Sequence, residues 1–146
     1  MEGGLTLYKG IDLSKYIVTK CVVDGCAISN LQLQKILYYV QKDFLQRDFV
    51  AFSDDIEAWQ FGPVVPVVYY KFCGFGAMPI TSTFEVGGID SLDLQAIDHV
   101  VDTKKSLNPW DLVADTHRKN GAWDQIYQNG LGNHNIIPRS LIKTEG

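Results

Sequence analysis

The sequence has few of the features that mark several large classes of protein. Its 146 residues include three cysteines, Cys21, Cys26 and Cys73, an odd number without the spacing of a disulfide framework. Glycine, proline or charge interrupts every apolar run within about ten residues, far short of the roughly 20 that a membrane-spanning helix needs. The acidic start of the chain, residues 1–4, is not typical of a secretory signal. We therefore expect a cytoplasmic protein with reduced thiols and no membrane contact.

Positive charge is also scarce. Lysine and arginine total 13 against 17 aspartates and glutamates, which gives a net charge of -4 and a pI near 5.2. The only adjacent basic pairs are Lys104-Lys105 and Arg118-Lys119, and neither is interleaved with aromatic residues. Proteins that bind nucleic acid concentrate basic residues on one surface. The sequence therefore predicts no direct contact with nucleic acid.

Motifs of the common catalytic sites are missing as well. The chain has no G-x-S-x-G elbow, no phosphate-binding G-x-x-x-x-G-K loop and no G-x-G-x-x-G turn. Its histidines, His99, His117 and His134, do not have metal-ligand spacing with a cysteine or carboxylate. Cys21 lies on an apolar helical face and Cys73 lies between phenylalanines, which favours buried, unreactive thiols. We expect no metal, no cofactor and no enzymatic activity.

Two pairs of carboxylates leave a chemical alternative open. Asp98 with Asp102, and Asp111 with Asp115, are spaced four residues apart, so each pair shares one face of a helix and could grip a divalent ion. Solvated helix faces and partners of the helix dipole explain the same spacing. A catalytic alternative would combine His117 with a carboxylate such as Asp115.

The residues that are present predict a mainly α-helical fold. A hydrophobic fraction of 46% and a charged fraction of 21% are typical of a globular protein, and 146 residues suffice for one core. We expect a single compact helical domain over residues 1–146, with a small β element and a loosely ordered start over residues 1–11. Apolar periodicity and capping residues predict helices that begin near positions 12, 29, 63, 91, 109, 122 and 138. The predicted N-caps are Asp12, Ser29, Asn108 and, for the helix near position 91, either Asp90 or Ser91.

The helix that follows Ser29 has the clearest pattern. Ser29 and Gln32 form a capping box, and apolar residues then recur every three or four positions at Leu33, Ile36, Leu37, Val40 and Phe44. This pattern places the polar residues Gln34, Lys35 and Gln41 on other faces. Tyr38 and Tyr39 point about 100° apart, so at least one of them should lie at the edge of the buried stripe.

The segment from Glu57 to Tyr69 predicts a rigid corner. We expect an extended run that turns at Gly62 and continues as a helix with Pro63 at its first position, while Pro66 still falls in the first turn. Large aromatic side chains surround this corner: Trp59, Phe61 and Tyr69. The corner could be wedged into the core, or it could form a platform for a partner. A second strand-like segment, Ile80 to Val86, could pair with Ile56 to Trp59 as a small sheet that rests on the helices.

Two of these segments resemble a known family. Residues 30–41, Asn-Leu-Gln-Leu-Gln-Lys-Ile-Leu-Tyr-Tyr-Val-Gln, resemble the signature helix of the Panacea domain family. Residues 56–69, Ile-Glu-Ala-Trp-Gln-Phe-Gly-Pro-Val-Val-Pro-Val-Val-Tyr, resemble its second signature at the usual separation. Residues 116–123 are similar to a third region, although Ala122 replaces the usual proline, and residues 136–142 resemble the closing helix. The resemblance covers most of residues 12–142.

This resemblance implies a mainly α-helical protein of prophages and mobile elements. Members of the family are typically antitoxins that neutralise a neighbouring toxin by direct contact, and a SocA-like subgroup acts as an adaptor that delivers a toxin to a protease. Other members are phage-encoded proteins. The positions of this chain that match the family are candidate partner-binding or scaffold residues: Lys35, Tyr38, Tyr39, Trp59, Gly62, Pro63, Tyr69, His117 and Trp123.

The sequence thus favours a non-enzymatic protein that inhibits a cognate toxin by protein–protein contact. One alternative is a phage-borne inhibitor of a host defence or host machine, because an acidic protein suits a basic target. A second is a proteolysis adaptor with a protease as an additional partner. The third is the enzyme that would use His117.

Overall fold

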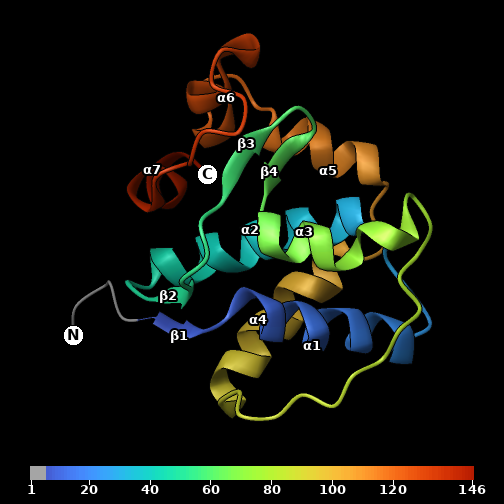
Figure 1. The fold of residues 1–146 in the computed structure, drawn as a ribbon. Coiled ribbons are helices and arrows are strands. Elements are labelled where there is room, and N and C mark those ends of the chain that lie inside the picture. Colours follow the sequence, from blue (N-terminus) through green and yellow to red (C-terminus); the bar gives the residue numbers. More distant parts are fainter. Residues whose placement is uncertain (1–5) are drawn as a thin grey trace.

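The structure is a computed structural model that describes residues 6–146 and is mainly α-helical with a small β component, which confirms the expected fold class (Figure 1). None of the helices in this described part combines the length and the apolar character that crossing a membrane requires. The helices are α1 (Gly10–Val23), α2 (Asn30–Gln46), α3 (Pro66–Phe72), α4 (Ser91–Lys104), α5 (Pro109–Thr116), α6 (Ala122–Tyr127) and α7 (Arg139–Glu145), with 3-10 turns η1 (Cys73–Phe75) and η2 (Gln128–Gly130). The strands are β1 (Thr6–Tyr8), β2 (Val50–Phe52), β3 (Glu57–Trp59) and β4 (Gly62–Val64).

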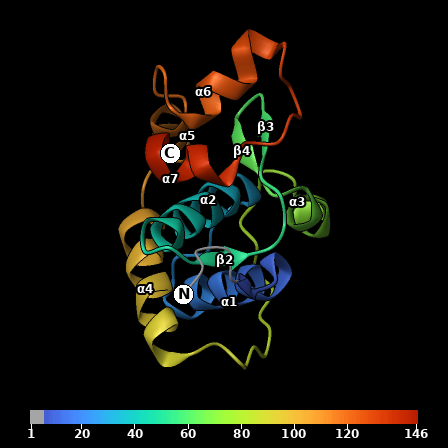
Figure 2. The same ribbon diagram turned by 90° about the vertical axis from the view of Figure 1, so that its left-hand side faces the viewer.

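Helix α2 runs through the middle of the molecule, and α1, α3, α4, α5 and α7 pack around it (Figures 1 and 2). The predicted capping box is confirmed, because the Ser29 side chain accepts the Gln32 N–H and the Gln32 side chain accepts the Ser29 N–H. The predicted apolar stripe is also confirmed: Leu33, Ile36, Leu37, Val40 and Phe44 are all buried. The strongest local pattern of the sequence therefore forms the centre of the fold.

The polar residues of α2 lie differently from our expectation. Gln34, Lys35 and Gln41 are buried instead of facing away from the core. Each is retained there by backbone groups of other elements: Gln34 accepts the N–H of Val65, and Gln41 bonds to both an N–H and a carbonyl of β2. The prediction was wrong because neighbouring elements cover α2 on nearly every side and supply hydrogen-bond partners to its polar residues.

The beginning of the described chain is more ordered than we expected. Strand β1 pairs in parallel with β2, with Thr6 opposite Val50 and Tyr8 opposite Phe52. Helix α1 then begins at Gly10, whose N–H donates to the Asp54 carboxylate at 2.8 Å. Our expectation of a loosely ordered start therefore does not hold for residues 6–11, and for residues 1–5 it lies outside the described residues.

The corner is a β-hairpin followed by a helix. Strand β3 pairs antiparallel with β4, so our expected pairing of Ile56–Trp59 with Ile80–Val86 was wrong. Pro63 lies within β4 opposite Ala58, and α3 begins at Pro66, three residues later than predicted. Ala58 directs its N–H and carbonyl away from β4, toward Asn135 and His134. Proline fits at position 63 because no ladder hydrogen bond is required there.

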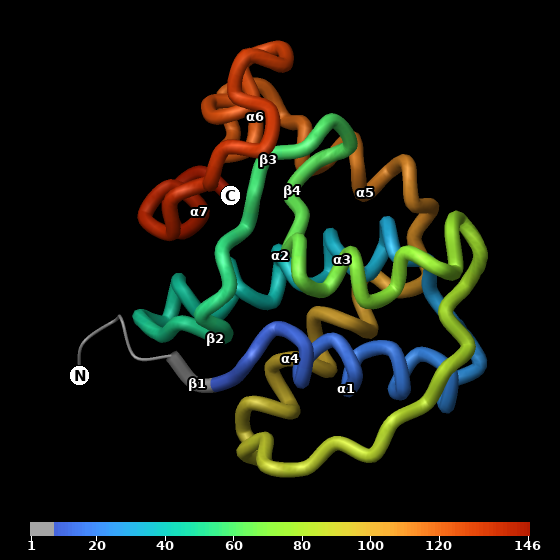
Figure 3. The backbone as a smooth tube through the Cα atoms, viewed as in Figure 1, coloured from blue at the N-terminus to red at the C-terminus, as the bar shows by residue number. Residues whose placement is uncertain are grey.

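A long connection joins η1 to α4. Residues 79–90 have no regular secondary structure and extend beneath α1 along the margin of the molecule, as the tube in Figure 3 shows. Asp90 then caps α4 through the N–H of Leu92, and Asn108 caps α5 through the N–H of Trp110. The sequence predicted the Asn108 cap and left Asp90 and Ser91 open as the cap of α4, and the structure shows Asp90 in this role.

Candidate functional site

Most of the candidate residues meet where α2, the β3–β4 hairpin, α5 and α6 come together. Lys35 lies at the centre of this region with no exposed surface, and its Nζ donates to the Pro63 carbonyl at 3.2 Å. Burial lowers the pKa of Lys35 from its ordinary value of 10.5 to about 7. A lysine with this environment is part of the scaffold and holds the hairpin against α2.

Gly62 permits the close approach of the hairpin to Lys35. Its φ of +114° lies in a region that other residues rarely adopt. A Cβ atom at this position would lie 2.8 Å from Lys35 Cε and 2.8 Å from Thr116 Oγ1. Both distances are too short for real contacts, so glycine is required for backbone conformation and for space.

His117 and Trp123 continue the same cluster. Their rings stack with centroids 3.7 Å apart and planes inclined by 4°, and Trp123 Nε1 donates to the Trp59 carbonyl at 2.7 Å. Within the described residues, the buried Nε2 of His117 has no hydrogen-bond partner. Desolvation and the nearby charge of Lys35 lower the pKa of His117. This stacking ties the end of α5 to α6 and to the hairpin.

The catalytic pairing of His117 with Asp115 has no support in this geometry. Asp115 accepts a hydrogen bond from the Tyr39 hydroxyl, and the carboxylate whose charge acts on His117 is that of Asp124. Among the described residues, no group of three or more histidine, cysteine, aspartate or glutamate side chains is placed to hold a metal ion. The expected absence of a cofactor or metal stays a prediction.

Tyr38 and Tyr39 lie about one turn after Lys35 on α2. Tyr38 is 2% exposed and burial raises its pKa to about 12, while Tyr39 is 9% exposed and so lies at the edge of the core. The Nζ of Lys104 lies 4.2 Å from the centroid of the Tyr39 ring. Tyr39 thus connects α2 to α4 and, through its hydroxyl, to Asp115 of α5.

An open cavity lies beside the scaffold cluster. It has a volume of about 500 Å³, and we call it the aromatic groove, defined by Trp59, Phe61, Tyr69, Cys73, Trp110 and His134. Two aromatic pairs in edge-to-face geometry line it. Trp59 and Tyr69 have centroids 5.0 Å apart, and Phe61 and Trp110 have centroids 5.5 Å apart. The sequence-based candidates Trp59, Tyr69 and Lys35 thus line the groove, although Lys35 has no exposed surface, whereas Gly62 and Pro63 do not line it.

The outer pair of the groove is exposed. Phe61 is 47% and Trp110 is 58% exposed, and they come from segments almost 50 residues apart in the chain. Large aromatic residues are enriched in protein interfaces, and exposed apolar patches often mark binding sites. Our sequence analysis missed Trp110 as a site residue. The sequence position of Trp110 could have indicated its exposure, because a tryptophan in the first turn of a short capped helix has few core residues to pack against.

Cys73 also corrects our sequence analysis. We expected a buried thiol, but Cys73 is exposed at the rim of the groove, where its Sγ lies 3.1 Å from the Tyr70 carbonyl oxygen. Helix α3 ends at Phe72, and η1 then turns the chain outward. The neighbouring phenylalanine was therefore a poor guide to the position of the thiol. Cys21, in contrast, is buried as predicted.

The wall of the groove opposite α3 has strained backbone. His134 stacks on Trp59 with centroids 4.4 Å apart and has a φ of +69°. The preceding segment contains two more residues with positive φ that are not glycine, Gln128 at +51° and Asn129 at +56°. Such conformations cost about 1 kcal/mol or more each and cluster at functional sites. Of these three residues, only His134 lines the groove, so strained backbone adjoins the groove at this one position.

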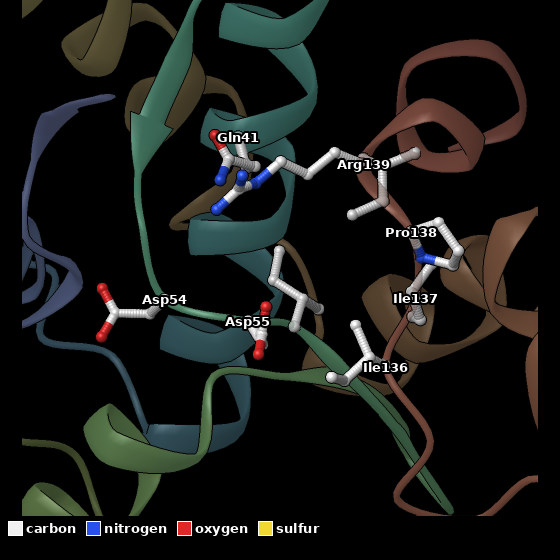
Figure 4. Close-up of a pocket in the computed structure, with 9 residues that line it drawn as sticks. Gln41, Asp54, Asp55, Ile136, Ile137, Pro138 and Arg139 are labelled. Atoms are coloured by element: carbon white, nitrogen blue, oxygen red, sulfur yellow. The ribbon is translucent and has the colours of Figure 1, made fainter. Parts of the chain in front are cut away.

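A second cavity of about 280 Å³ lies between the β2–β3 connection and α7 (Figure 4). Its wall includes the isoleucines Ile56, Ile136 and Ile137 together with Asp55 and Arg139. The guanidinium of Arg139 donates to the Ser53 carbonyl at 2.9 Å. None of the nine candidate residues lines this cavity. The aromatic groove is therefore the better candidate for a functional site.

Comparison with known proteins agrees with the resemblance found in the sequence. The family model described as "Antitoxin SocA-like, Panacea domain" matches residues 33–124, a range that contains all nine candidate residues. Antitoxin SocA of Caulobacter vibrioides (strain NA1000 / CB15N) is 31% identical over 133 residues, which cover 82% of this chain and 70% of that protein. No solved structure matches the chain.

Proposed function

The chain belongs to the Panacea-domain family of SocA-like antitoxins, and we propose on this premise that it neutralises a cognate toxin by direct contact at the aromatic groove. The family supports the antitoxin role in general. Direct contact, the location of the contact and the absence of enzymatic activity are our proposals.

The observation that carries this proposal is the exposed aromatic pair at the mouth of the groove. Trp110 and Phe61 present large apolar surface to solvent, while the parts of the site beneath them are fixed by the buried Lys35 and by Gly62. A rigid base with exposed aromatic residues is typical of binding hot spots, because few side chains have to be ordered when the partner arrives. This arrangement fits a protein partner better than it fits a reaction centre.

A substitution at Trp110 tests the proposal. The purified chain is mixed with the product of the gene that neighbours its own, and affinity is measured by calorimetry. We expect Trp110→Ala to weaken binding about thirtyfold or more, the effect of removing a hot-spot residue. The variant should fold normally, because the backbone N–H of Trp110, not its side chain, contacts the capping residue Asn108.

Leu92→Ala provides the matched control. Leu92 is 71% exposed in the first turn of α4, so it is also a large apolar residue in a capped first turn, but it does not line the groove. Its replacement should leave affinity unchanged. The proposal would be contradicted if Trp110→Ala and Leu92→Ala lost equal affinity for the toxin, or if the unmodified protein did not bind it.

An activity assay separates direct neutralisation from delivery to a protease. We expect the purified chain to inhibit the purified toxin at stoichiometric concentrations with no protease present. If the toxin remains fully active in this mixture and loses activity only when a cellular protease is added, the chain acts as an adaptor instead.

A further inference from the structure

The connection beneath α1 contains an extended segment without a strand partner. From Ile80 to Val86 the side chains alternate strictly between the two sides of the chain. Ile80 is fully buried and Ser82, Phe84 and Val86 are partly buried, whereas Thr81, Thr83 and Glu85 are exposed. Period-two burial is the signature of a β-strand that lies on a core. We call residues Ile80–Val86 the strap.

The inner edge of the strap is hydrogen-bonded to the body of the protein. The N–H of Ile80 donates to the Ile28 carbonyl at 2.8 Å, and the N–H of Phe84 donates to Thr19 Oγ1 at 2.9 Å. Ile80 and Phe84 are separated by an even number of positions, so their backbone groups point to the same edge of an extended chain. In a strand, the N–H and carbonyl of one residue point to the same edge, and successive residues point to opposite edges. The backbone groups of Thr81, Thr83 and Glu85 therefore point to the outer edge.

The outer edge has no hydrogen-bond partner within residues 6–146. No backbone hydrogen bond of Thr81, Thr83 or Glu85 occurs in this part of the chain, and their side chains are exposed. The tube in Figure 3 runs along the margin of the molecule here. Edge strands are usually protected by charged side chains, proline or a bulge; the strap contains no lysine or proline, and Glu85 is its one charged residue. The open edge is thus a template for a further strand.

We propose that the strap binds an extended segment of the cognate toxin, which adds to its outer edge as a β-strand. This inference rests on the proposed function. The toxin is the occupant we favour because the strap is continuous with the aromatic groove: Gly76 and Ala77 line the groove, and the strap begins three residues later. A segment of the toxin that leaves the groove next to Ala77 would then follow the chain toward Ile80, where the strap begins. Main-chain hydrogen bonds then add affinity, and the groove supplies specificity.

Two proline substitutions test which edge of the strap contributes to toxin binding. Thr83→Pro removes an N–H from the outer edge, whereas Ser82→Pro, the matched control, removes one from the inner edge. Neither N–H has a partner in the described structure, and proline is compatible with an extended backbone. Both variants should therefore retain the thermal stability of the unmodified protein. We expect Thr83→Pro to weaken toxin binding about tenfold and Ser82→Pro to leave it unchanged.

Hydrogen exchange provides an independent measurement on the unmodified protein. Binding of the toxin should slow exchange of the Thr81, Thr83 and Glu85 amides by at least about tenfold, while the Ser82 amide remains fast. Equal losses for both proline variants, or unchanged binding by Thr83→Pro, would overturn the inference. A free protein that is dimeric until Thr83→Pro separates it would overturn it as well, because a second copy would then occupy the edge.

The outcomes also distinguish this inference from the proposed function. If Trp110→Ala weakens binding and Thr83→Pro does not, the toxin binds at the groove without adding a strand. If the unmodified chain does not bind the toxin, the proposed function fails and the inference falls with it.

Discussion

Replacing Lys35 with methionine should remove a pH dependence of stability that the buried ammonium group creates. Burial sets the pKa of Lys35 at about 7 in the folded protein, against 10.5 for an ordinary lysine. Between these values the unfolded chain binds a proton that the folded chain has released. Stability therefore rises with pH from about 7 to about 10.5, and this contribution is lost as the pH falls toward 7. Methionine has similar length and no charge.

The size of the effect follows from the difference between the two pKa values. The full difference corresponds to about 5 kcal/mol, because one pH unit is worth about 1.4 kcal/mol. Between pH 7 and pH 9 the lysine becomes neutral in the folded protein but stays charged in the unfolded chain. The free-energy cost of burying Lys35 therefore falls by about 2 kcal/mol over this range. From pH 7 to pH 9, the free energy of unfolding should therefore rise by about 2 kcal/mol more in the unmodified protein than in Lys35→Met.

Urea unfolding at pH 7, 8 and 9 measures this difference. The buried Tyr38 and Cys21 also have shifted pKa values, but they are common to both proteins and cancel in the comparison. His117, whose pKa desolvation and the charge of Lys35 lower from its ordinary value of 6.5, titrates below this pH range in the unmodified protein. Lys119→Met, which removes an exposed lysine, is the control and should show no such trend. If the difference between Lys35→Met and the unmodified protein stays constant within about 0.5 kcal/mol, Lys35 is not desolvated as the structure indicates.

Three further predictions concern the scaffold and the thiols. Gly62→Ala should cost about 2–5 kcal/mol, since it combines a disfavoured φ with a clash against Lys35, and scanning calorimetry should show a melting temperature roughly 6–15 °C lower. Ser29→Ala removes half of the capping box of α2 and should lower stability by about 1 kcal/mol in urea titrations, so an unchanged midpoint would argue against the cap. Iodoacetamide should modify the exposed Cys73 at least roughly tenfold faster than the buried Cys21, whose pKa burial raises to about 11, and mass spectrometry that finds the reverse order would contradict their placement.

Local signals in the sequence predicted helix boundaries better than they predicted contacts between segments. Ser29 and Asn108 were identified as N-caps, and Asp90 was one of two candidates with Ser91, because capping depends on residues within one turn of the helix. The predicted cap Asp12 was wrong, since α1 begins at Gly10 with Lys9 as its N-cap. The start of α3 was placed at Pro63 instead of Pro66, since both prolines suit a first helical turn. The choice between them depends on the pairing of β3 with β4, which Gly62 makes possible and which no short window of sequence reveals.

The candidate site could be predicted only in part, because some of its residues are neighbours in the sequence and others meet only in the folded protein. Trp59, Phe61 and Tyr69 stand close together in the sequence, so the aromatic corner could be recognised. Trp110 joins them only because α5 packs beside the hairpin, and this contact spans almost 50 residues of chain. Lys35 was assigned to another face of α2 because it lies outside the apolar periodicity of that helix. Its burial follows from the number of elements that surround α2, which composition does not indicate.

The enclosure of α2 limits how its sequence can change. A helix on the surface of a protein usually has one face on which mutations accumulate at little cost, but every position from Leu33 to Gln41 is buried. Each neighbour of α2 constrains a different subset of these nine positions, and compensating for one altered side chain would require changes in a distant segment. Under the proposed binding mode, diversification toward new toxins is therefore easier at the exposed groove and the strap, which can vary while the central helix stays the same.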